Sequence, residues 1–363
     1  MTRKFLLLAL TGALLLGTGL TAQTPKVLQQ GLVYPCARAS GAIVVDGDLS
    51  DAPWNAAALV SGFRDSGKNI IFPEPMAMQL LWDDQNIYLA VTCYESKMKS
   101  LVANETAHDG AFWEDDCIEI FFDPRHLHTD HYQLAVTAKG VGYDSWKGDR
   151  LWTKPWNVKT KLHGDRWTVE LAIPFTTLGV EKITPAAFWG FNLCRERLAG
   201  GSRELANWAD VERNFNTPEL FGHLLFVPAN WQPAPAGLAD IAARAAGTVD
   251  NLLYAPAGIW TITPDGKGQF ASYLDQVRVL FQSPPPQAQE LRQVFAANPK
   301  LPHAKDFAKL AEEFADWQKK AAAKDQFDGV FLSKAILFNE LYRTQLKNYY
   351  WKAKLAQLNA DMP

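Results

Sequence analysis

Hydrophobic and polar positions alternate with a period of two through much of residues 43–228, which predicts β-strands. Residues 78–82 and 87–94 both alternate, and the turn formers at 83–86 between them predict a hairpin. Residues 167–173 alternate until a proline ends the run. Many short strands separated by turn signals predict a mainly β fold, an antiparallel two-sheet β-sandwich of the jelly-roll or immunoglobulin-like type.

The pattern changes towards the C-terminus. Residues 231–237 are rich in Pro and Ala and indicate a linker, and residues 259–273 predict a hairpin. Phe307, Leu310 and Phe314 then follow the spacing of one helix face. These changes divide the chain into a signal peptide (1–22), an N-terminal lead-in (23–40), the β-sandwich (41–228), a linker (229–240) and a mostly helical C-terminal region of unassigned role (241–363).

The first residues predict export. Arg3 and Lys4 precede the apolar run 5–16, and small residues follow up to Ala22, after which we expect cleavage. The chain is therefore expected in the periplasm or outside the cell. No later stretch approaches the ~18 consecutive apolar residues of a membrane span, so none is expected after the signal is removed.

Composition excludes some classes of function. The chain has 363 residues, 48% of them hydrophobic, and a net charge of −3, so it has ample material for a core and no basic surplus for nucleic acid. Its cysteines lack the spacing of a zinc site. Those inside predicted strands are expected to act as small buried hydrophobes, and no disulfide pairing is assigned; the cysteines are Cys36, Cys93, Cys117 and Cys194.

The strand at residues 117–123 offers the clearest candidate chemistry. Side chains alternate across a strand, so the core face takes Ile118, Ile120 and Phe122. Glu119 lies on the other face, and Trp113 joins it if the extended conformation continues backwards. A carboxylate beside a large aromatic ring is what a sugar needs for hydrogen bonding and stacking. The simpler alternative is an ordinary strand with a Trp at its entry.

Several short motifs follow one another along the sandwich segment. They are Val45–Leu49 with Trp54, residues 81–84 with 87–89, Trp113 with Asp116 and residues 119–123, then residues 167–175, 190–192 and 218–222. Together, their order and spacing resemble a family 9 carbohydrate-binding module. The resemblance covers about half of the chain and leaves out the helical region.

This resemblance implies a β-sandwich that grips a terminal sugar of a glycan between two aromatic rings. The first ring maps onto Trp113 and the acid beside it onto Glu119. The second ring maps onto Phe215, where the best-characterised members carry Trp. An Arg that such members present to the sugar maps onto Ala135, and Gln133 on the same face is the expected substitute hydrogen-bonding group.

The implied partner is a carbohydrate, either a plant-type or another polysaccharide or the end of an oligosaccharide. The implied role is that of a non-catalytic binding protein that serves polysaccharide capture or degradation. Related modules bind calcium, so a structural calcium ion is a further expectation. Hard oxygen ligands suit that ion. The chain offers such ligands at Asp46, Asp48, Asp83 and Asp84.

Two other classes of function stay open. A glycoside hydrolase, or an accessory subunit that hydrolyses O-glycosyl bonds, needs two carboxyl groups ~5–9 Å apart across a cleft; the candidates are Glu114, Asp115, Asp116, Glu119 and Glu170. A cell-surface scaffold would use the sandwich to hold a partner and the helices to assemble.

Four histidines also attract attention. They are His108, His126, His128 and His131. Imidazoles are common metal ligands, although a polar loop between strands explains the same residues. We expect the polar loop.

Overall fold

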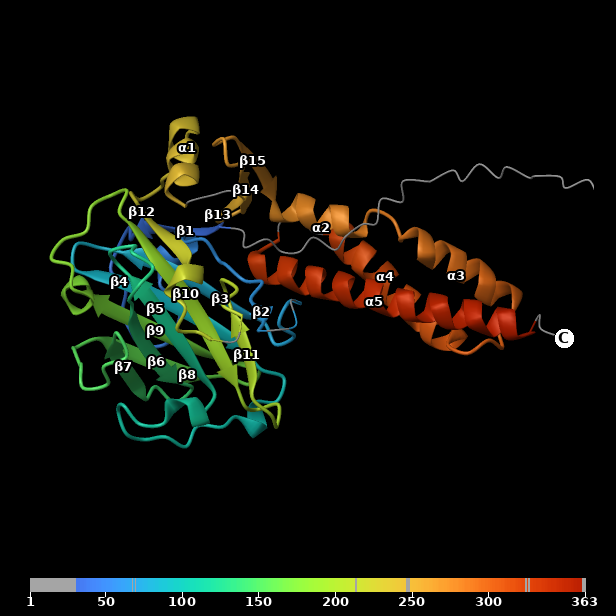
Figure 1. The fold of residues 1–363 in the computed structure, drawn as a ribbon, viewed down its shortest axis with the longest axis horizontal. Helices are drawn as coiled ribbons and strands as arrows, with labels where there is room; N and C mark the ends of the chain where they lie inside the picture. Colours follow the sequence, from blue (N-terminus) through green and yellow to red (C-terminus); the bar gives the residue numbers. More distant parts are fainter. Residues whose placement is uncertain are drawn as a thin grey trace, which may run out of the picture.

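The computed structural model describes residues 31–360, apart from residues 67, 69, 213, 246–248, 324 and 326. The predicted signal peptide lies outside the described residues. A large β-region carries an elongated helical arm, residues 273–360 (Figure 1). The strands are β1 (Gly31–Arg38), β2 (Arg64–Asp65), β3 (Met76–Trp82), β4 (Asn86–Tyr94), β5 (Cys117–Asp123), β6 (Tyr132–Thr137), β7 (Gly142–Trp146), β8 (Asn157–Leu162), β9 (Arg166–Pro174), β10 (Phe188–Arg197), β11 (Glu204–Asn207), β12 (Gly222–Val227), β13 (Asn251–Ala255), β14 (Gly258–Ile262) and β15 (Gly268–Ser272).

Helices are concentrated after the β-region. The α-helices are α1 (Pro235–Arg244), α2 (Tyr273–Phe281), α3 (Pro286–Ala297), α4 (Ala304–Ala323) and α5 (Gly329–Ala360). Short 3-10 helices are η1 (Ala52–Ala56), η2 (Met98–Ser100), η3 (Phe112–Glu114), η4 (Phe175–Leu178) and η5 (Pro218–Leu220). The mainly β fold with a helical C-terminal region is therefore confirmed.

The strands form one continuous mixed sheet rather than the two antiparallel sheets that the sequence predicted. Its main path runs β7-β6-β5-β10-β12-β1-β3-β4-β9-β8. The parallel pairs among the described strands all involve β1, which runs parallel to β12, β13 and β3. The expectation of an antiparallel fold was wrong in this respect, because the lead-in 23–40 contains this strand.

The alternation of apolar and polar residues does not predict β1, and there is a physical reason for this. It contains Pro35, which cannot donate a ladder hydrogen bond and normally argues against a central strand. The residues around Pro35 are nevertheless completely buried, namely Val33, Tyr34 and Cys36. The Tyr34 hydroxyl also donates to the carbonyl of Ala58 at 2.8 Å. Residues 31–38 thus belong to the sheet.

One core lies inside the curved sheet. The predicted core face of β5 is confirmed, because Ile118, Ile120 and Phe122 are fully buried in the main hydrophobic cluster. The predicted hairpin β3–β4 is also confirmed by its antiparallel register, Leu80 opposite Leu89. Every strand on the main path except β7 and β8 contributes buried residues to this cluster.

The predicted linker is partly helical. α1 begins at Pro235, where a proline is favoured in the first turn of a helix. Leu238 and Ile241 of α1 pack onto Leu225 and Leu253, so this segment is part of a hydrophobic cluster rather than a solvated spacer. The hairpin predicted at residues 259–273 is confirmed as β14–β15.

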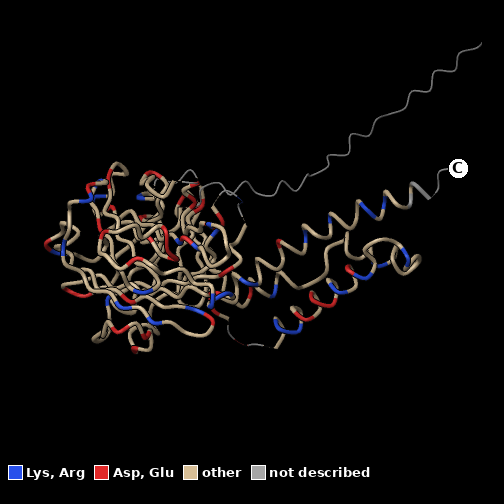
Figure 2. The backbone as a smooth tube through the Cα atoms, turned by 90° about the horizontal axis from the view of Figure 1, so that it is seen from below, with Lys and Arg blue, Asp and Glu red and all other residues tan. Residues whose placement is uncertain are grey.

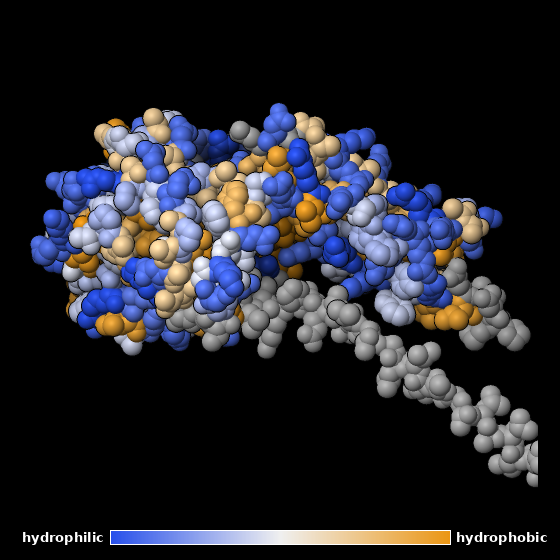
Figure 3. Space-filling model, turned by 90° about the horizontal axis from the view of Figure 1, so that it is seen from above, coloured by the Kyte–Doolittle hydropathy of each residue, from blue (hydrophilic) through white to orange (hydrophobic). Residues whose placement is uncertain are grey.

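The helical arm is attached to the sheet at its base. The hydroxyls of Ser61 and Ser333 lie 3.0 Å apart, and the backbone N–H of Ile71 donates to Glu340 at 3.1 Å. A cavity of about 840 Å³ lies beside this junction, lined in part by Trp208 and Tyr273. Viewed from above, hydrophobic residues are visible where the arm leaves the β-region (Figure 3).

Gly329 tests this attachment. A Cβ added there would lie 2.4 Å from the carbonyl oxygen of Leu59, a backbone atom that cannot turn aside. We expect Gly329→Ala to lower the free energy of unfolding by ~1–3 kcal/mol, as overpacking does, measured as a fall in Tm. Gly164→Ala is the matched control, because nothing lies within 4 Å of its added Cβ. Equal melting temperatures for the two variants would contradict this account.

The helices of the arm carry many charged residues. Positive and negative residues are interspersed along its helices (Figure 2), as is typical of a solvated helix surface. None of the helices in the described part of the chain combines the length and hydropathy that a membrane span needs.

The cysteines behave as predicted. Cys93, Cys117 and Cys194 are buried within strands, Cys36 is buried in β1, and none of these thiols is in a disulfide.

Candidate functional site

The second face of β5 carries the candidate site. In the register of β7, β6, β5, β10 and β11, one row across the sheet reads Tyr143, Ala135, Glu119, Cys194 and Asn207. Residues opposite one another in antiparallel strands point to the same face. This row therefore lies on the face turned away from the main core.

Glu119 and Gln133 meet on this face. The side-chain amide of Gln133 donates to Glu119 Oε2 at 2.6 Å, and Ser145 Oγ donates to Gln133 Oε1 at 3.3 Å. Glu119 is only 4% exposed and Gln133 9%. The sequence therefore placed these two groups together correctly, and their role in binding stays a prediction.

Glu196, which the sequence analysis did not single out, completes a carboxyl pair. It lies on β10 opposite Cys117, so it is a diagonal neighbour of Glu119 on the same sheet face. Burial, followed by the charge of Glu196, raises the pKa of Glu119 to about 8. Burial also raises the pKa of Glu196, while Arg203, whose Nε lies 3.3 Å from Glu196 Oε2, opposes that rise. Only the register of β5 and β10 brings these carboxyl groups together.

The first aromatic wall contains Trp113. The extended conformation does not continue back to this residue, because η3 intervenes, yet Trp113 packs against Phe112, Cys117, Ala135 and Tyr143 beside the Glu119 row. It is partly exposed. The sequence hypothesis thus put the ring near Glu119, although through a turn of 3-10 helix rather than through strand alternation.

A second aromatic wall lies across Glu119. Phe121 packs with Phe215, Phe221 and Val211. Phe215 is only 7% exposed, so it is mostly covered rather than presented as an open ring. Glu119 sits between Cys117 and Phe121 along β5, and hence between the two aromatic walls.

Arginines border Trp113. The guanidinium of Arg150, from the loop after β7, lies over the Trp113 ring at 4.9 Å from its centroid. Arg203 donates to the Trp113 carbonyl oxygen at 2.6 Å. The Arg150 guanidinium therefore covers part of one face of the indole.

The other acids considered for catalysis have local structural partners. Asp115 accepts the backbone N–H groups of Asn104 and Glu105, each at 2.8 Å. Asp116 likewise accepts from Val102 at 2.8 Å. Glu170 accepts from the Trp54 indole at 3.0 Å. These carboxylates fix loops to the sheet.

The histidines are divided among separate hydrogen bonds. His126 Nε2 lies 2.9 Å from Nδ1 of His223, a residue that the sequence analysis did not consider. His128 Nδ1 donates to the carbonyl of Pro218 at 3.0 Å, and His131 Nε2 lies 3.0 Å from Asn216 Oδ1. Burial, then His128, lowers the pKa of His126 to about 4. These contacts fit the polar loop that was expected.

The proposed calcium ligands do not form one donor set. Asp46 caps its own turn by accepting the N–H of Asp48 at 2.7 Å. Asp83 accepts from Asn86 at 2.7 Å, and Asp84 pairs with Arg38. Among the described residues, no group of three metal-type ligands includes any of these carboxylates.

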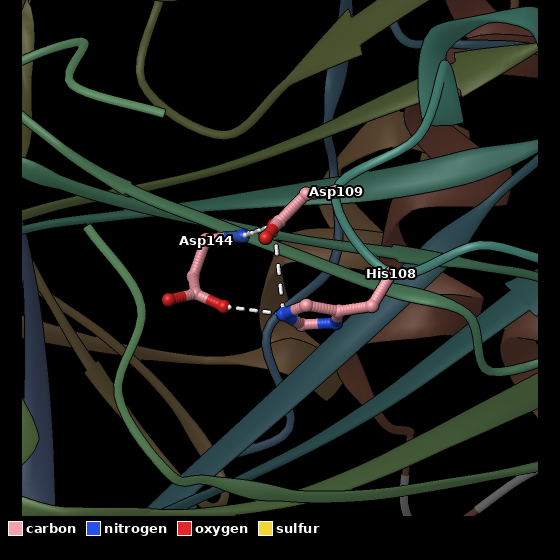
Figure 4. A group of neighbouring side chains, drawn as sticks. All are labelled: His108, Asp109 and Asp144. Atoms are coloured by element: carbon pink, nitrogen blue, oxygen red, sulfur yellow. Dashed lines mark hydrogen bonds and ion pairs between the residues drawn. The ribbon is translucent and has the colours of Figure 1, made fainter. Parts of the chain in front are cut away.

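A different trio has the spacing of a metal site. Ligand atoms of His108, Asp109 and Asp144 lie within 4.8 Å of one another (Figure 4). His108 Nε2 is 2.8 Å from Asp144 Oδ1, which also accepts from the Trp156 indole at 3.3 Å. Because these hydrogen bonds already satisfy the buried Asp144, the trio joins the loop before η3 to β7 without needing an ion.

The raised pKa of Glu119 predicts a pH-dependent stability. Burial favours the protonated carboxyl in the folded protein, so its contribution is greatest below the ordinary pKa of 4.5 and is lost as the pH rises to about 8. Glu119→Gln cannot ionise. We expect the Tm of this variant, relative to the wild type, to increase across that window in thermal melts. A constant difference between the two proteins would show that Glu119 is not held in a protonated state.

Comparisons with known proteins agree on the β-region. A family model described as "Carbohydrate family 9 binding domain-like" matches residues 45–228. The endo-1,4-beta-xylanases A of Thermotoga neapolitana and Thermotoga maritima are each 26% identical over 192 residues, 52% of this chain but only 17% of each xylanase.

One solved structure aligns with a similar share of this chain. It is a family 9 carbohydrate-binding module from Caldicellulosiruptor kristjanssonii in complex with glucose, 20% identical, with a TM-score of 0.43, covering 56% of this chain and all of that one (100%). Since the family model spans half of the sequence, the chain belongs to the carbohydrate family 9 binding domain-like proteins.

Proposed function

We propose that the protein is an exported, non-catalytic carbohydrate-binding protein that serves polysaccharide capture or degradation. One observation carries the proposal: in a chain of this family, a partly exposed indole and a carboxyl–amide pair lie at one sheet face. The ring of Trp113 offers a stacking surface, and Glu119 with Gln133 offers groups that bind sugar hydroxyls. Export rests on the sequence of residues 1–22 alone.

The proposed binding mode places a sugar, such as a glycan end, against Trp113. The sugar replaces the Arg150 guanidinium over the ring, and its hydroxyls reach the Glu119–Gln133 pair. The covered Phe215 contributes through the second wall rather than as an open platform. Calcium is not required by this arrangement and stays a prediction.

Binding is better supported than hydrolysis. Glu119 and Glu196 lie on neighbouring strands of one sheet face and are only 4% and 8% exposed, whereas a glycosidase presents two carboxyl groups ~5–9 Å apart to a cleft. Asp115, Asp116 and Glu170 are engaged by backbone and indole donors, as described above. Glu114 is 67% exposed and lies 3.7 Å from Arg203.

A docking role is the second candidate. The arm exposes Trp351 and Leu355, 70% and 60% accessible, on one face of α5. Exposed apolar side chains at this spacing are typical of a surface that contacts another helix. This role does not compete with sugar binding for the same residues.

A glycan array with the purified chain tests the proposal. We expect binding of one or more immobilised glycans that soluble sugar of the same kind displaces. Release of shorter products from soluble polysaccharides would instead support the hydrolase. If no glycan bound, the proposed function would be wrong and the docking role favoured.

A further inference from the structure

The far end of the helical arm exposes large apolar side chains. Trp351, Leu355 and Leu358 of α5 are 70%, 60% and 64% exposed, and we call them the tip stripe. Their spacing puts them on one side of the helix. The opposite side of α5 is buried within the arm, where Leu346 and Ala353 lie. α5 therefore has a second apolar stripe that faces solvent, at the end of the arm furthest from the β-region (Figure 1).

The charges around the tip stripe have one sign. From residue 343 onwards α5 contains no Asp or Glu, and its cations there are Arg343, Lys347, Lys352 and Lys354. This part of α5, next to the C-terminus, accordingly shows Lys and Arg without acids (Figure 2). Lys347 and Lys352 are exposed, and neither pairs with a carboxylate among the described residues. The helical period places Lys347 on one side of the stripe and Lys352 on the other.

A pocket of about 390 Å³ lies beside the tip stripe. Its walls come from α3 and α5, and they are Pro286, Gln287, Glu290, Lys347, Tyr350 and Trp351. The Glu290 carboxylate is already paired with Lys354 at 2.7 Å, so the unmatched charge at this pocket is that of Lys347. A Lys ammonium binds phosphate as a point charge. The pocket therefore offers a place for a phosphate group next to an exposed indole.

The length of the stripe favours a lipid surface over a partner helix. From Trp351 to Leu358 it extends only about 10 Å along the helix axis, whereas a coiled-coil seam needs about three or more heptads. One and two turns earlier, the same side of α5 carries the polar Asn348 and Thr344, which are exposed. A Trp at the end of such a short stripe suits the interface between lipid and water.

The charge of the stripe also argues against a second copy of the chain. Pairing two copies through this surface would bring Lys347 and Lys352 of each copy towards the same residues of the other. Like charges beside a helix seam oppose association. An anionic bilayer attracts the same lysines instead, and a basic helix with exposed Trp and Leu is typical of one that lies on a membrane surface.

We propose that the end of the arm binds the surface of an anionic lipid bilayer. The tip stripe inserts at the level of the head groups, and Lys347 and Lys352 lie against lipid phosphates. The arm lies on the membrane without crossing it, since no helix in the described part of the chain can span one. The candidate sugar site stays free, because none of its residues belongs to the arm. This inference does not depend on sugar binding.

Co-sedimentation with lipid vesicles tests the proposal. The protein is the chain that begins at Gln23, because the apolar run 5–16 would itself enter lipid, and it contains every described residue. One set of vesicles is phosphatidylcholine alone, and in the other phosphatidylglycerol replaces about a third of the lipid. We expect binding at least about tenfold tighter to the anionic vesicles. Raising NaCl from about 0.1 M to about 1 M should abolish that preference, because the Debye length falls from ~10 Å to ~3 Å.

A pair of charge variants locates the attraction. In Lys347→Gln/Lys352→Gln, affinity for the anionic vesicles should fall at least about tenfold, because each lysine near the surface contributes roughly fivefold. Lys159→Gln/Lys319→Gln is the matched control. It removes the same charge from two exposed residues, neither of which lies on α5, so its affinity should stay within about twofold of the wild type.

A second pair of variants tests insertion. Trp351→Ser/Leu355→Ser should weaken binding to the anionic vesicles at least about tenfold, because less apolar surface enters the bilayer. Its Tm and circular dichroism should not change, since both side chains are mostly exposed. The control is Val279→Ser, which removes a 71% exposed apolar side chain from α2 and should bind as the wild type does.

The other outcomes overturn the inference. It is wrong if the protein binds neither kind of vesicle, or if both tip variants bind as tightly as the wild type. It is also wrong if sedimentation shows a dimer that Trp351→Ser/Leu355→Ser converts to a monomer, because the tip stripe is then an interface between copies. Each of these results leaves sugar binding untouched, which the glycan array tests separately.

Discussion

A chain that starts at residue 41 is expected not to fold. It lacks β1, which sits between β12 and β3 in the middle of the sheet and also pairs with β13. Val33 and Tyr34 are completely buried, and burying such side chains is worth ~1.5–3 kcal/mol each. The lost ladder bonds add to this, and the whole stability of a domain is only ~5–15 kcal/mol.

The comparison uses chains that begin at residue 31 and at residue 41 and share the same C-terminus. Circular dichroism and thermal melting should show a cooperative β-type protein for the first and no cooperative transition for the second. Equal melting curves would mean that β1 is dispensable and that residues 41–228 hold the sheet alone.

Removing the charge of Glu95 is expected to have the second largest effect. This residue is 1% exposed and accepts from Arg195 at 3.0 Å and from Arg197 at 2.7 Å. Arg195 is itself fully buried. Glu95→Gln leaves a buried guanidinium without its counter-charge, and breaking such a pair lowers the free energy of unfolding by ~3–5 kcal/mol.

The surface pair of Arg38 and Asp84 is the matched control. Its side chains are 40% and 76% exposed, so Asp84→Asn should leave the stability nearly unchanged. Denaturant unfolding measures both variants. A small effect at Glu95 would show that water reaches the buried cluster and solvates it.

Local patterns predicted much of the sheet. Alternation placed Ile118 and Ile120 in the core, and turn residues marked the β3–β4 hairpin. The inward face of β9 was also predicted correctly, since Trp167 and Leu171 are fully buried. These elements were accessible because the strand face that packs into the main core is uniformly apolar while the other face is mixed. That difference leaves a period of two in the sequence even in β5, whose residues are buried on both faces.

Features that depend on strand register could not be predicted from the sequence. Glu196 pairs with Glu119 only because β10 lies beside β5, an order that no local pattern encodes. The charges around it, Arg195 to Arg197, resemble an exposed run although the segment is buried. The sequence also could not show that Phe215 is covered. Its ring maps onto a binding position but packs in a cluster with Phe121 and Phe221.

The most direct test of the central claim is the effect of Trp113→Ala on sugar affinity and on Tm, measured on the same protein sample. If Trp113 is a partly exposed stacking surface, affinity should fall by ~1–3 kcal/mol, roughly 5- to 150-fold, with little change in Tm. Trp351→Ala, which removes a 70% exposed ring from α5, should change neither quantity. A stability loss of ~3–5 kcal/mol, as for a core ring, or an unchanged affinity with an intact fold, would contradict the proposed site.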